Sequence, residues 1–358
     1  MQQNKGLDKN QLISFFVFSL ILVGFMFFFQ NKQQKEEAAK AAQNPKTEQA
    51  TTPVKPTNAA NLNNTITPNS IATVSLKNAD LNLEFSSLGG QISKVELLKY
   101  KAYDHKTDEA DLPLYLMNKN NSTYGFQFKD KSGKLINTKD LVFSPTVSGN
   151  SVTMTNNLNG AVIQFIYTLL PNYTLDFKVK SQGLAQITSD AKASFIWDYQ
   201  VRNLEKGRSQ EQAHSEFAYA FDNYSAYDYD ARTDMSEEKE TLNWIGIKQQ
   251  FFTSVLEAKN GFTQSKGYQD NIEEGEFLKK MNYDGQVQMA GNELNQDFTW
   301  YFMPLELNLL KSYDKNFDEI LPLGWSFIGS MNRWFFMPMY NFISSWGLTA
   351  GWAIFLMT

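Results

Sequence analysis

The sequence contains no cysteine, which excludes disulfide bonds, a thiolate nucleophile and thiolate metal ligands. Histidine is scarce as well, because His105 and His214 are the only two and each stands alone in a polar stretch. The motifs of phosphate-binding loops, serine-hydrolase elbows and zinc proteases are also missing. We therefore expect no catalytic residues, no metal and no cofactor, and we do not expect this chain to be an enzyme.

The sequence also has no excess of basic residues. The chain has 33 Lys and Arg against 38 Asp and Glu, a formal net charge of −5, and no basic cluster. Nucleic-acid surfaces carry such clusters, so no nucleic-acid partner is expected. Two acidic pairs, Glu237-Glu238 and Glu273-Glu274, lie in polar stretches, and we expect both to be solvated.

What the sequence does contain, close to its start, is a long apolar run. Residues 12–29 (LISFFVFSLILVGFMFFF) carry no charge and only two serines. A helix needs about 20 apolar residues to cross a bilayer, whereas a cleaved signal peptide has a shorter run closely followed by small residues. The small residues come late here, so we predict an uncleaved anchor, with lysines on both sides leaving its orientation open. The residues assigned to membrane anchoring are Leu12, Phe15, Phe16, Leu20, Leu22, Phe25 and Phe29.

A second apolar stretch closes the chain. Residues 346–358 would form a helix of roughly 20 Å, too short for the bilayer core of about 30 Å. On pattern alone, this stretch is either the start of a second membrane helix or a buried helix of a soluble domain.

A polar segment at 30–70 follows the anchor. Residues 31–69 contain four prolines and no aromatic residue. Such a segment buries too little apolar surface to offset its ordering entropy, so we predict a flexible linker.

From about residue 71 to 303 the hydrophobic period is two. Leu81, Leu83 and Phe85 alternate with polar residues, and a Gly89-Gly90 turn follows. The clearest hairpin has its turn at Pro171-Asn172, between two runs of alternating apolar residues. Such alternation is typical of antiparallel sheet with one buried face, so we predict a single mainly β sandwich over 71–303.

Within that range, residues 205–241 are highly charged and carry several tyrosines. Clustered Tyr and Asp side chains could line a ligand site, but charged stretches of this kind are more often solvated loops. We expect a loop.

The pattern changes to a helical spacing after Met303. Leu307, Leu310, Phe317 and Leu321 are spaced as on short helices, for which Pro304 is a plausible start. We assign residues 304–324 to short helices that close the domain.

Residues 325–345 are predicted to form an amphipathic helix lying on the bilayer surface. Ile328, Met331, Phe335, Met339 and Phe342 share one side of a helical wheel, with serines, an asparagine and an arginine opposite. The alternative is a helix that packs on its own domain, and Pro338 should kink or interrupt it in either case. The residues assigned to the interface are Trp325, Arg333, Trp334, Phe335, Phe342 and Trp346.

In this order the segments resemble the YidC-type membrane protein insertases of Gram-negative bacteria, in a form like that of the Bacteroidetes. The resemblance covers essentially the whole chain, with motifs that are individually weak. The stretches that carry it are DKNQLISFFVFSLILVGFMFFF, ADLNLEFSSLGGQISKVELLKY, NWIGIKQQFFTSVL, WYFMPLELNLLKSYDKNFDEILPLGW and SMNRWFFMPMYNFISSWGLTAGWAIFLMT.

This resemblance implies a bacterial inner-membrane protein with a cytoplasmic N-terminus at 1–11. It also implies a periplasmic β-supersandwich similar to galactose-mutarotase-like domains. Residues 346–358 would begin the family's five-helix insertase core, whose arginine-bearing groove would lie beyond Thr358. The partners implied are the lipid bilayer, nascent inner-membrane proteins, and the Sec translocon with its SecDF accessory. The chain then resembles an N-terminal portion of such an insertase and chaperone.

A different class of protein stays open as an alternative: a membrane-tethered carbohydrate-binding or epimerase-like β-sandwich. An aldose epimerase needs a positioned acid and base, typically His with Glu. Neither His105 nor His214 has a sequence context that predicts such a pair.

Overall fold

The structure is a computed structural model that describes residues 71–230, 234–238, 240–321 and 335–346, with the single residues 351 and 355. The predicted anchor at 12–29 and the linker at 30–70 lie outside the described residues. Among the helices that are described, none combines the length and the apolar character needed to cross a bilayer.

The first sheet has four antiparallel strands in chain order, β1 (Thr73–Lys77), β2 (Leu81–Ser86), β3 (Gln91–Asp104) and β4 (Glu109–Met117). Leu81, Leu83 and Phe85 of β2 are buried, as their alternation predicts. The turn between β2 and β3 places Gly90 at φ +59°, where a Cβ would lie 2.9 Å from the ring of Phe143. Glycine is therefore required at this turn by both backbone and packing.

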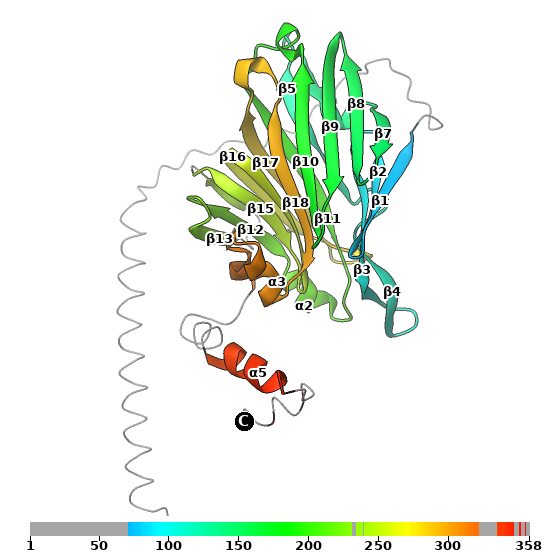
Figure 1. Cartoon of the computed structure of the whole chain (residues 1–358), viewed down its shortest axis with the longest axis vertical. Helices are drawn as coiled ribbons and strands as arrows, with labels where there is room; N and C mark the ends of the chain where they lie inside the picture. Colours follow the sequence, from blue (N-terminus) through cyan, green and yellow to red (C-terminus); the bar gives the residue numbers. More distant parts are fainter. Residues whose placement is uncertain are drawn as a thin grey trace, which may run out of the picture. The chain divides into compact units, whose positions relative to one another are not determined.

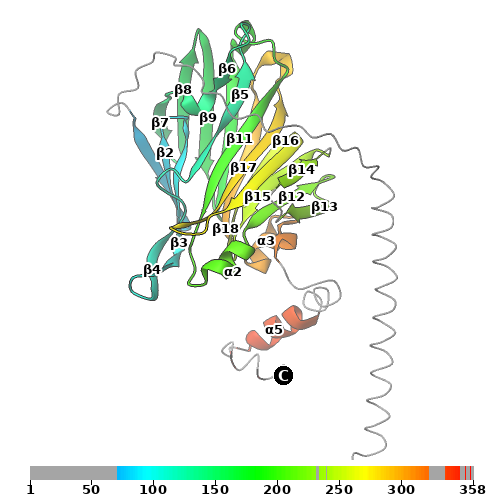
Figure 2. The same ribbon diagram turned by 180° about the vertical axis from the view of Figure 1, so that it is seen from behind.

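The second sheet has 14 antiparallel strands, whose main order is β6-β5-β11-β17-β16-β18-β10-β9-β8-β7. Both views show the small sheet beside β7–β9 (Figures 1 and 2). The strands of this main path are β5 (Ser122–Lys129), β6 (Leu135–Asn137), β7 (Ser144–Ser148), β8 (Ser151–Leu158), β9 (Ala161–Leu169), β10 (Thr174–Gln182), β11 (Lys192–Arg202), β16 (Phe252–Asn271), β17 (Phe277–Gln288) and β18 (Gln296–Pro304). Short 3-10 turns lie at η2 (Thr138–Asp140), η3 (Leu184–Gln186) and η4 (Ala290–Asn292).

The predicted hairpin at Pro171-Asn172 is confirmed as β9 and β10. Phe177 of β10 lies opposite Tyr167 of β9, and their rings stack at 4.6 Å between centroids. Both side chains are buried, together with the other inward-facing residues of the two strands. The period of two therefore predicts this pairing correctly.

Two tyrosines connect the sheets inside the core. The Tyr124 hydroxyl lies 2.9 Å from that of Tyr167 and accepts a hydrogen bond from the Ile92 N–H of the small sheet. Tyr167 donates to the Gly90 carbonyl. Burial raises the pKa of Tyr124 above its ordinary value, so the hydroxyl stays protonated. Together the sheets form the predicted mainly β, antiparallel fold.

The prediction of a loop at 205–241 is wrong. This stretch forms α2 (Arg208–Ala213), β12 (Glu216–Phe221), β13 (Ala226–Asp230) and β14 (Asp234–Glu238). β12 lies between β13 and β15 (Leu242–Lys248) and is almost wholly buried. Its charged residue is neutralised internally, since Glu216 Oε1 lies 2.5 Å from Lys248 Nζ. The prediction failed because Glu216 is paired inside the fold, while Lys206, Asp222 and Asp228 lie at exposed positions in or next to these elements.

The prediction of a helix start at Pro304 is also wrong. Pro304 is the last residue of β18 and pairs with Phe252, and the helix α3 begins three residues later (Leu307–Ser312). A positive φ at Asn316 separates α3 from η5 (Phe317–Ile320). The apolar spacing still places Leu310 and Phe317 in the core, as predicted.

The last described helix, α5, spans Met337–Ser344. Pro338 is its second residue, and Phe335 and Phe336 directly before it are π-helical, so the regular α-helix begins next to the proline. Trp325, Arg333 and Trp334 of the predicted interfacial helix lie outside the described residues.

Candidate functional site

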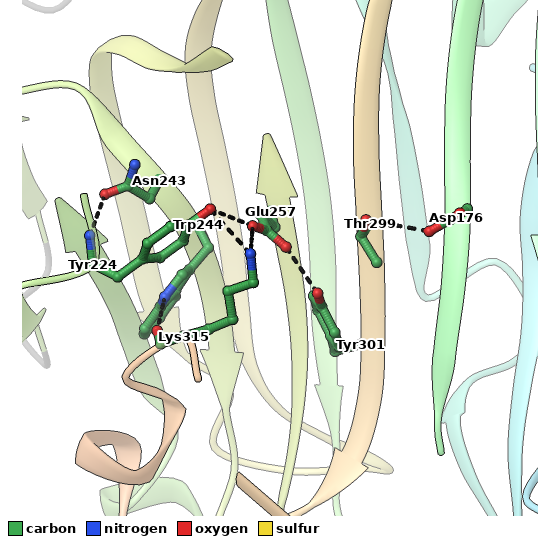
Figure 3. Close-up of polar contacts among 8 residues, drawn as sticks. All are labelled: Asp176, Tyr224, Asn243, Trp244, Glu257, Thr299, Tyr301 and Lys315. Atoms are coloured by element: carbon green, nitrogen blue, oxygen red, sulfur yellow. Dashed lines mark hydrogen bonds and ion pairs between the residues drawn. The ribbon is translucent and has the colours of Figure 1, made fainter. Parts of the chain in front are cut away.

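Residues 313–317, between α3 and η5, are held against the large sheet by a buried carboxylate. We call them the docking segment. Lys315 Nζ lies 2.6 Å from Glu257 Oε1, and Glu257 projects from β16 with 9% of its side chain exposed (Figure 3). A charge this buried needs full pairing, so the other contacts of Glu257 decide whether the site is stable.

Two tyrosines complete the pairing of Glu257. Tyr224, between β12 and β13, donates its hydroxyl to Oε1, and Tyr301 of β18 donates to Oε2 at 2.8 Å (Figure 3). Burial raises the pKa of both tyrosines, and the Glu257 carboxylate raises it further. Burial alone lowers the pKa of Lys315, but its contacts with Glu257 and Tyr224 raise it overall. The tyrosines therefore stay neutral and Lys315 stays charged.

Aromatic side chains fix the backbone of the docking segment. Trp244 Nε1 donates to the Lys315 carbonyl at 3.0 Å, and the Tyr313 hydroxyl donates to the carbonyl of Asn172. Phe317 is fully buried, with its ring 4.9 Å from Tyr301 and 5.3 Å from Trp244. Both oxygens of Glu257, and the ammonium and hydroxyl groups that contact them, are thus paired with one another, so the arrangement is suited to holding the chain rather than to chemistry.

A second feature is a hollow of about 250 Å³ on the outward side of β5, β11 and β17, strands that lie side by side in Figure 2. We call it the polar hollow. Asp198 Oδ1 accepts from Asn282 Nδ2 at 2.5 Å, and its Oδ2 lies 3.3 Å from Lys139 Nζ. The lining residues are Asn120, Asn121, Thr123, Asp198, Tyr199, Gln200, Lys280 and Asn282.

Sequence reasoning missed both features. Glu257 and Lys315 are 58 residues apart and Tyr224 and Glu257 are 33 apart, with no local pattern that links them. The lining of the polar hollow consists largely of the polar half of alternating strands, which by itself indicates only a solvated face. The strand register would have been needed to bring these residues together.

The described residues of the predicted interfacial helix expose large aromatic rings. Phe335, Phe342 and Trp346 are 57%, 62% and 61% exposed, and the rings of Phe342 and Trp346 are 5.2 Å apart. Among the α5 residues whose burial is described, Ile343 is the one buried hydrophobic residue. Exposed aromatics at this density are typical of a surface that contacts a partner or a membrane.

The two histidines lie in separate places. His105 is exposed in the β3–β4 turn beside Tyr103, and His214 follows α2 with Nδ1 2.7 Å from the Gln210 carbonyl. Glu273 and Glu274 are exposed, as predicted, whereas the side chains of Glu237 and Glu238 lie outside the description. Across the described ranges, no three His, Asp or Glu side chains are grouped to hold a metal.

The described part of the chain is thus an antiparallel β-sandwich domain that ends in a docked segment and an aromatic-bearing helix. The family model described as "YidC periplasmic domain" matches residues 73–339. The chain belongs to this family.

Curated relatives agree with this assignment. The membrane protein insertase YidC of Azobacteroides pseudotrichonymphae is 27% identical over 98% of this chain, and that of Phocaeicola vulgatus is 28% identical over 98%. The chain covers 60% of each of these relatives, and 46% of the one from Parabacteroides distasonis.

Two solved structures are also similar. A galactose mutarotase related enzyme from Lactobacillus acidophilus has a TM-score of 0.40 and 9% identity, and covers 65% of this chain and 97% of its own. The periplasmic domain of Thermotoga maritima YidC has a TM-score of 0.33 and 13% identity, over 69% of this chain and 92% of its own.

Proposed function

We propose that this chain is the N-terminal portion of a membrane protein insertase and chaperone that inserts and folds inner-membrane proteins. The observation that carries the proposal is the family match over residues 73–339, together with relatives named as YidC insertases. The chain spans 60% of those relatives, so the activity is proposed for the complete protein.

The proposed organisation follows the sequence. Residues 1–11 lie in the cytoplasm, 12–29 anchor the chain, 30–70 form the linker, and 71–303 form a periplasmic domain of the bacterial inner membrane. Residues 304–324 close the domain, and 325–345 lie at the interface with lipid. Residues 346–358 begin the second spanning helix. Partners in this proposal are nascent inner-membrane proteins and the Sec translocon with SecDF.

The docking segment has a mechanical role in this proposal. It lies between the last strand of the sandwich and the residues that lead to α5. Because Glu257, Trp244 and Tyr301 all contact it, the chain leaves the sandwich from a fixed position. The exposed rings of Phe335, Phe342 and Trp346 would then bury in the bilayer interface, where aromatic side chains are favoured.

We further propose that the chain performs no bond-making chemistry of its own. In support, the ring of His105 lies against Tyr103, His214 Nδ1 lies next to the Gln210 carbonyl, and the buried Glu257 is fully paired. A general acid or base needs a side chain that reaches a reacting group.

The insertase proposal is tested with the complete gene product in proteoliposomes. A newly synthesised single-span inner-membrane protein should become protected from added protease in these vesicles, and less so in empty vesicles of the same lipid. Equal protection in both would contradict the proposal.

A further inference from the structure

The polar hollow has no part in the proposed insertase function, yet its lining has an ordered arrangement. Thr123, Asp198, Asn282 and Tyr268 lie directly opposite one another on four adjacent strands, β5, β11, β17 and β16. Adjacent strands are about 4.8 Å apart, so these side chains form a row across the outward face. Next to this row, Gln200 lies opposite Lys280.

Several lining groups are free to bind a ligand. Within the part of the chain that the structure describes, the side chains of Asn120, Thr123, Gln200 and Lys280 have no protein hydrogen-bond partner. Asn121 differs, because it is 3% exposed and its Nδ2 bridges the carbonyls of Leu116 and Gln200. Asn121 therefore fixes the rim, while the free amides, hydroxyl and ammonium face the hollow.

The charges in and around the hollow cancel when Asp270, which lies opposite Lys280 on β16, is counted with them. Asp198 is the one carboxylate in the lining, and Lys139 pairs with it while Lys280 adds a second positive charge. Amides offer a donor and an acceptor side by side, and each oxygen of the Asp198 carboxylate can accept one more hydrogen bond beside its contact with Asn282 or Lys139. Hydroxyl groups both donate and accept, so this lining matches a neutral ligand with several hydroxyls.

An aromatic ring lies on the same face. Tyr268 is opposite Asn282 and is 40% exposed, and its hydroxyl donates to Asp270 at 2.5 Å. A ring of this kind covers apolar C–H groups, while the amides beside it bind hydroxyls. We propose that the polar hollow binds a neutral pyranose ring of a saccharide.

Other ligand classes fit less well. A metal ion would find one carboxylate with two lysines nearby, and an anion would meet Asp198. An extended peptide adds to a sheet at an exposed strand edge, but β11 and β17 are paired on both sides. A volume of about 250 Å³ also suits one small ring.

The test uses the full chain in phosphatidylcholine nanodiscs, which contain no sugar. Saturation-transfer difference NMR is recorded with methyl β-D-glucopyranoside and methyl β-D-galactopyranoside. We expect saturable transfer to the ring protons of at least one glycoside, with a dissociation constant on the order of 1 mM. Asp198→Asn keeps the shape of the side chain and should weaken binding by about tenfold or more, the loss of a charge-assisted hydrogen bond.

The matched control is Asp284→Asn, which lies two residues from Asn282 on the same strand and face but outside the hollow. It should bind as the wild type does, and circular dichroism should show all three proteins equally folded. No transfer from either glycoside, or equal binding by all three proteins, would overturn the proposal. A tri-alanine amide that binds in place of both sugars and is lost in Asp198→Asn would assign the hollow to peptides, and would overturn it as well.

Discussion

At the residue scale, both carboxylate oxygens of Glu257 are occupied, one by Lys315 and Tyr224 and the other by Tyr301. Removing Lys315 leaves a nearly buried carboxylate without its positive partner, which costs more than the pair itself contributes. The effect should be largest in the docking segment, because Lys315 belongs to it.

We predict that Lys315→Met lowers the unfolding free energy by about 1–3 kcal/mol, less than for a fully buried pair because Lys315 is 29% exposed. Hydrogen exchange measured by mass spectrometry should speed up in peptides covering residues 305–321. Lys311→Met is the control, since Lys311 is exposed at the end of α3. Identical exchange in the two variants would show that the Glu257 pair does not hold the segment.

Glu211 gives a pH dependence at the same scale. It is 1% exposed in α2 and accepts hydrogen bonds from the Leu204 and Glu205 N–H groups and from the Asn203 side chain. Burial raises its pKa to about 7, although these donors act in the opposite direction. A raised carboxyl pKa means that the folded state binds this proton more tightly than the unfolded state.

The stability contributed by that proton is therefore fully present below about pH 4.5 and is lost as the pH rises through about 7. We predict that Glu211→Gln removes up to about 3 kcal/mol of this decline between pH 4.5 and 7.5 in urea titrations. The exposed Glu273→Gln should keep the wild-type slope. An unchanged slope in Glu211→Gln would refute the assignment.

At the residue scale, the sequence predicted which side chains are buried and which are exposed to solvent. Leu81, Phe85 and Phe177 are buried where alternation places them, and Glu273 is solvated. The interaction partners of individual side chains could not be predicted. Glu257 and Lys315, for example, come together only because the chain after β18 folds back onto β16. Local patterns carry no information about such distant pairs.

At the element scale, β16 is the strand that joins the two parts of the large sheet. Its first half pairs with β15 and β18, and from Thr263 onward it pairs with β17. Gly261 lies at this change, with φ at +71°, and a Cβ there would be 2.3 Å from Thr241 Cγ2 and 3.0 Å from the Leu242 carbonyl oxygen. Glycine is needed here for both backbone and space.

We predict that Gly261→Ala lowers the unfolding free energy by about 2–4 kcal/mol, from backbone strain plus the steric clash. Gly275→Ala is the matched control, because Gly275 also has a positive φ of +94° but open space around its Cα. The control should lose only about 1 kcal/mol of unfolding free energy, because an alanine there meets backbone strain but no steric clash. Denaturation of both in urea gives the comparison, and equal losses would mean that the contact with Thr241 does not matter.

The element predictions succeeded where one face of a strand meets water, as in β2, β9 and β10. They failed at β12, whose residues are buried on both faces and show no alternation. They failed again at Pro304, because a proline can end a strand as readily as it begins a helix.

At the scale of the whole molecule, the described domain belongs to a family named for its periplasmic location, and Phe335, Phe342 and Trp346, in α5 or close to its ends, expose their rings. The sequence assigns these three residues to a helix that lies on the bilayer surface, and this assignment stays a prediction. The central claim is that they contact lipid while the sandwich stays in water.

The most direct test places a nitroxide spin label at Phe342→Cys, since the chain has no other cysteine. The full chain is studied in lipid nanodiscs, with Leu135→Cys, 55% exposed on the sandwich strand β6, as the matched control. We predict that the label at 342 is relaxed more by oxygen, which concentrates in lipid, than by a water-soluble nickel chelate, with the reverse at 135. The same preference for the chelate at both positions would contradict the account.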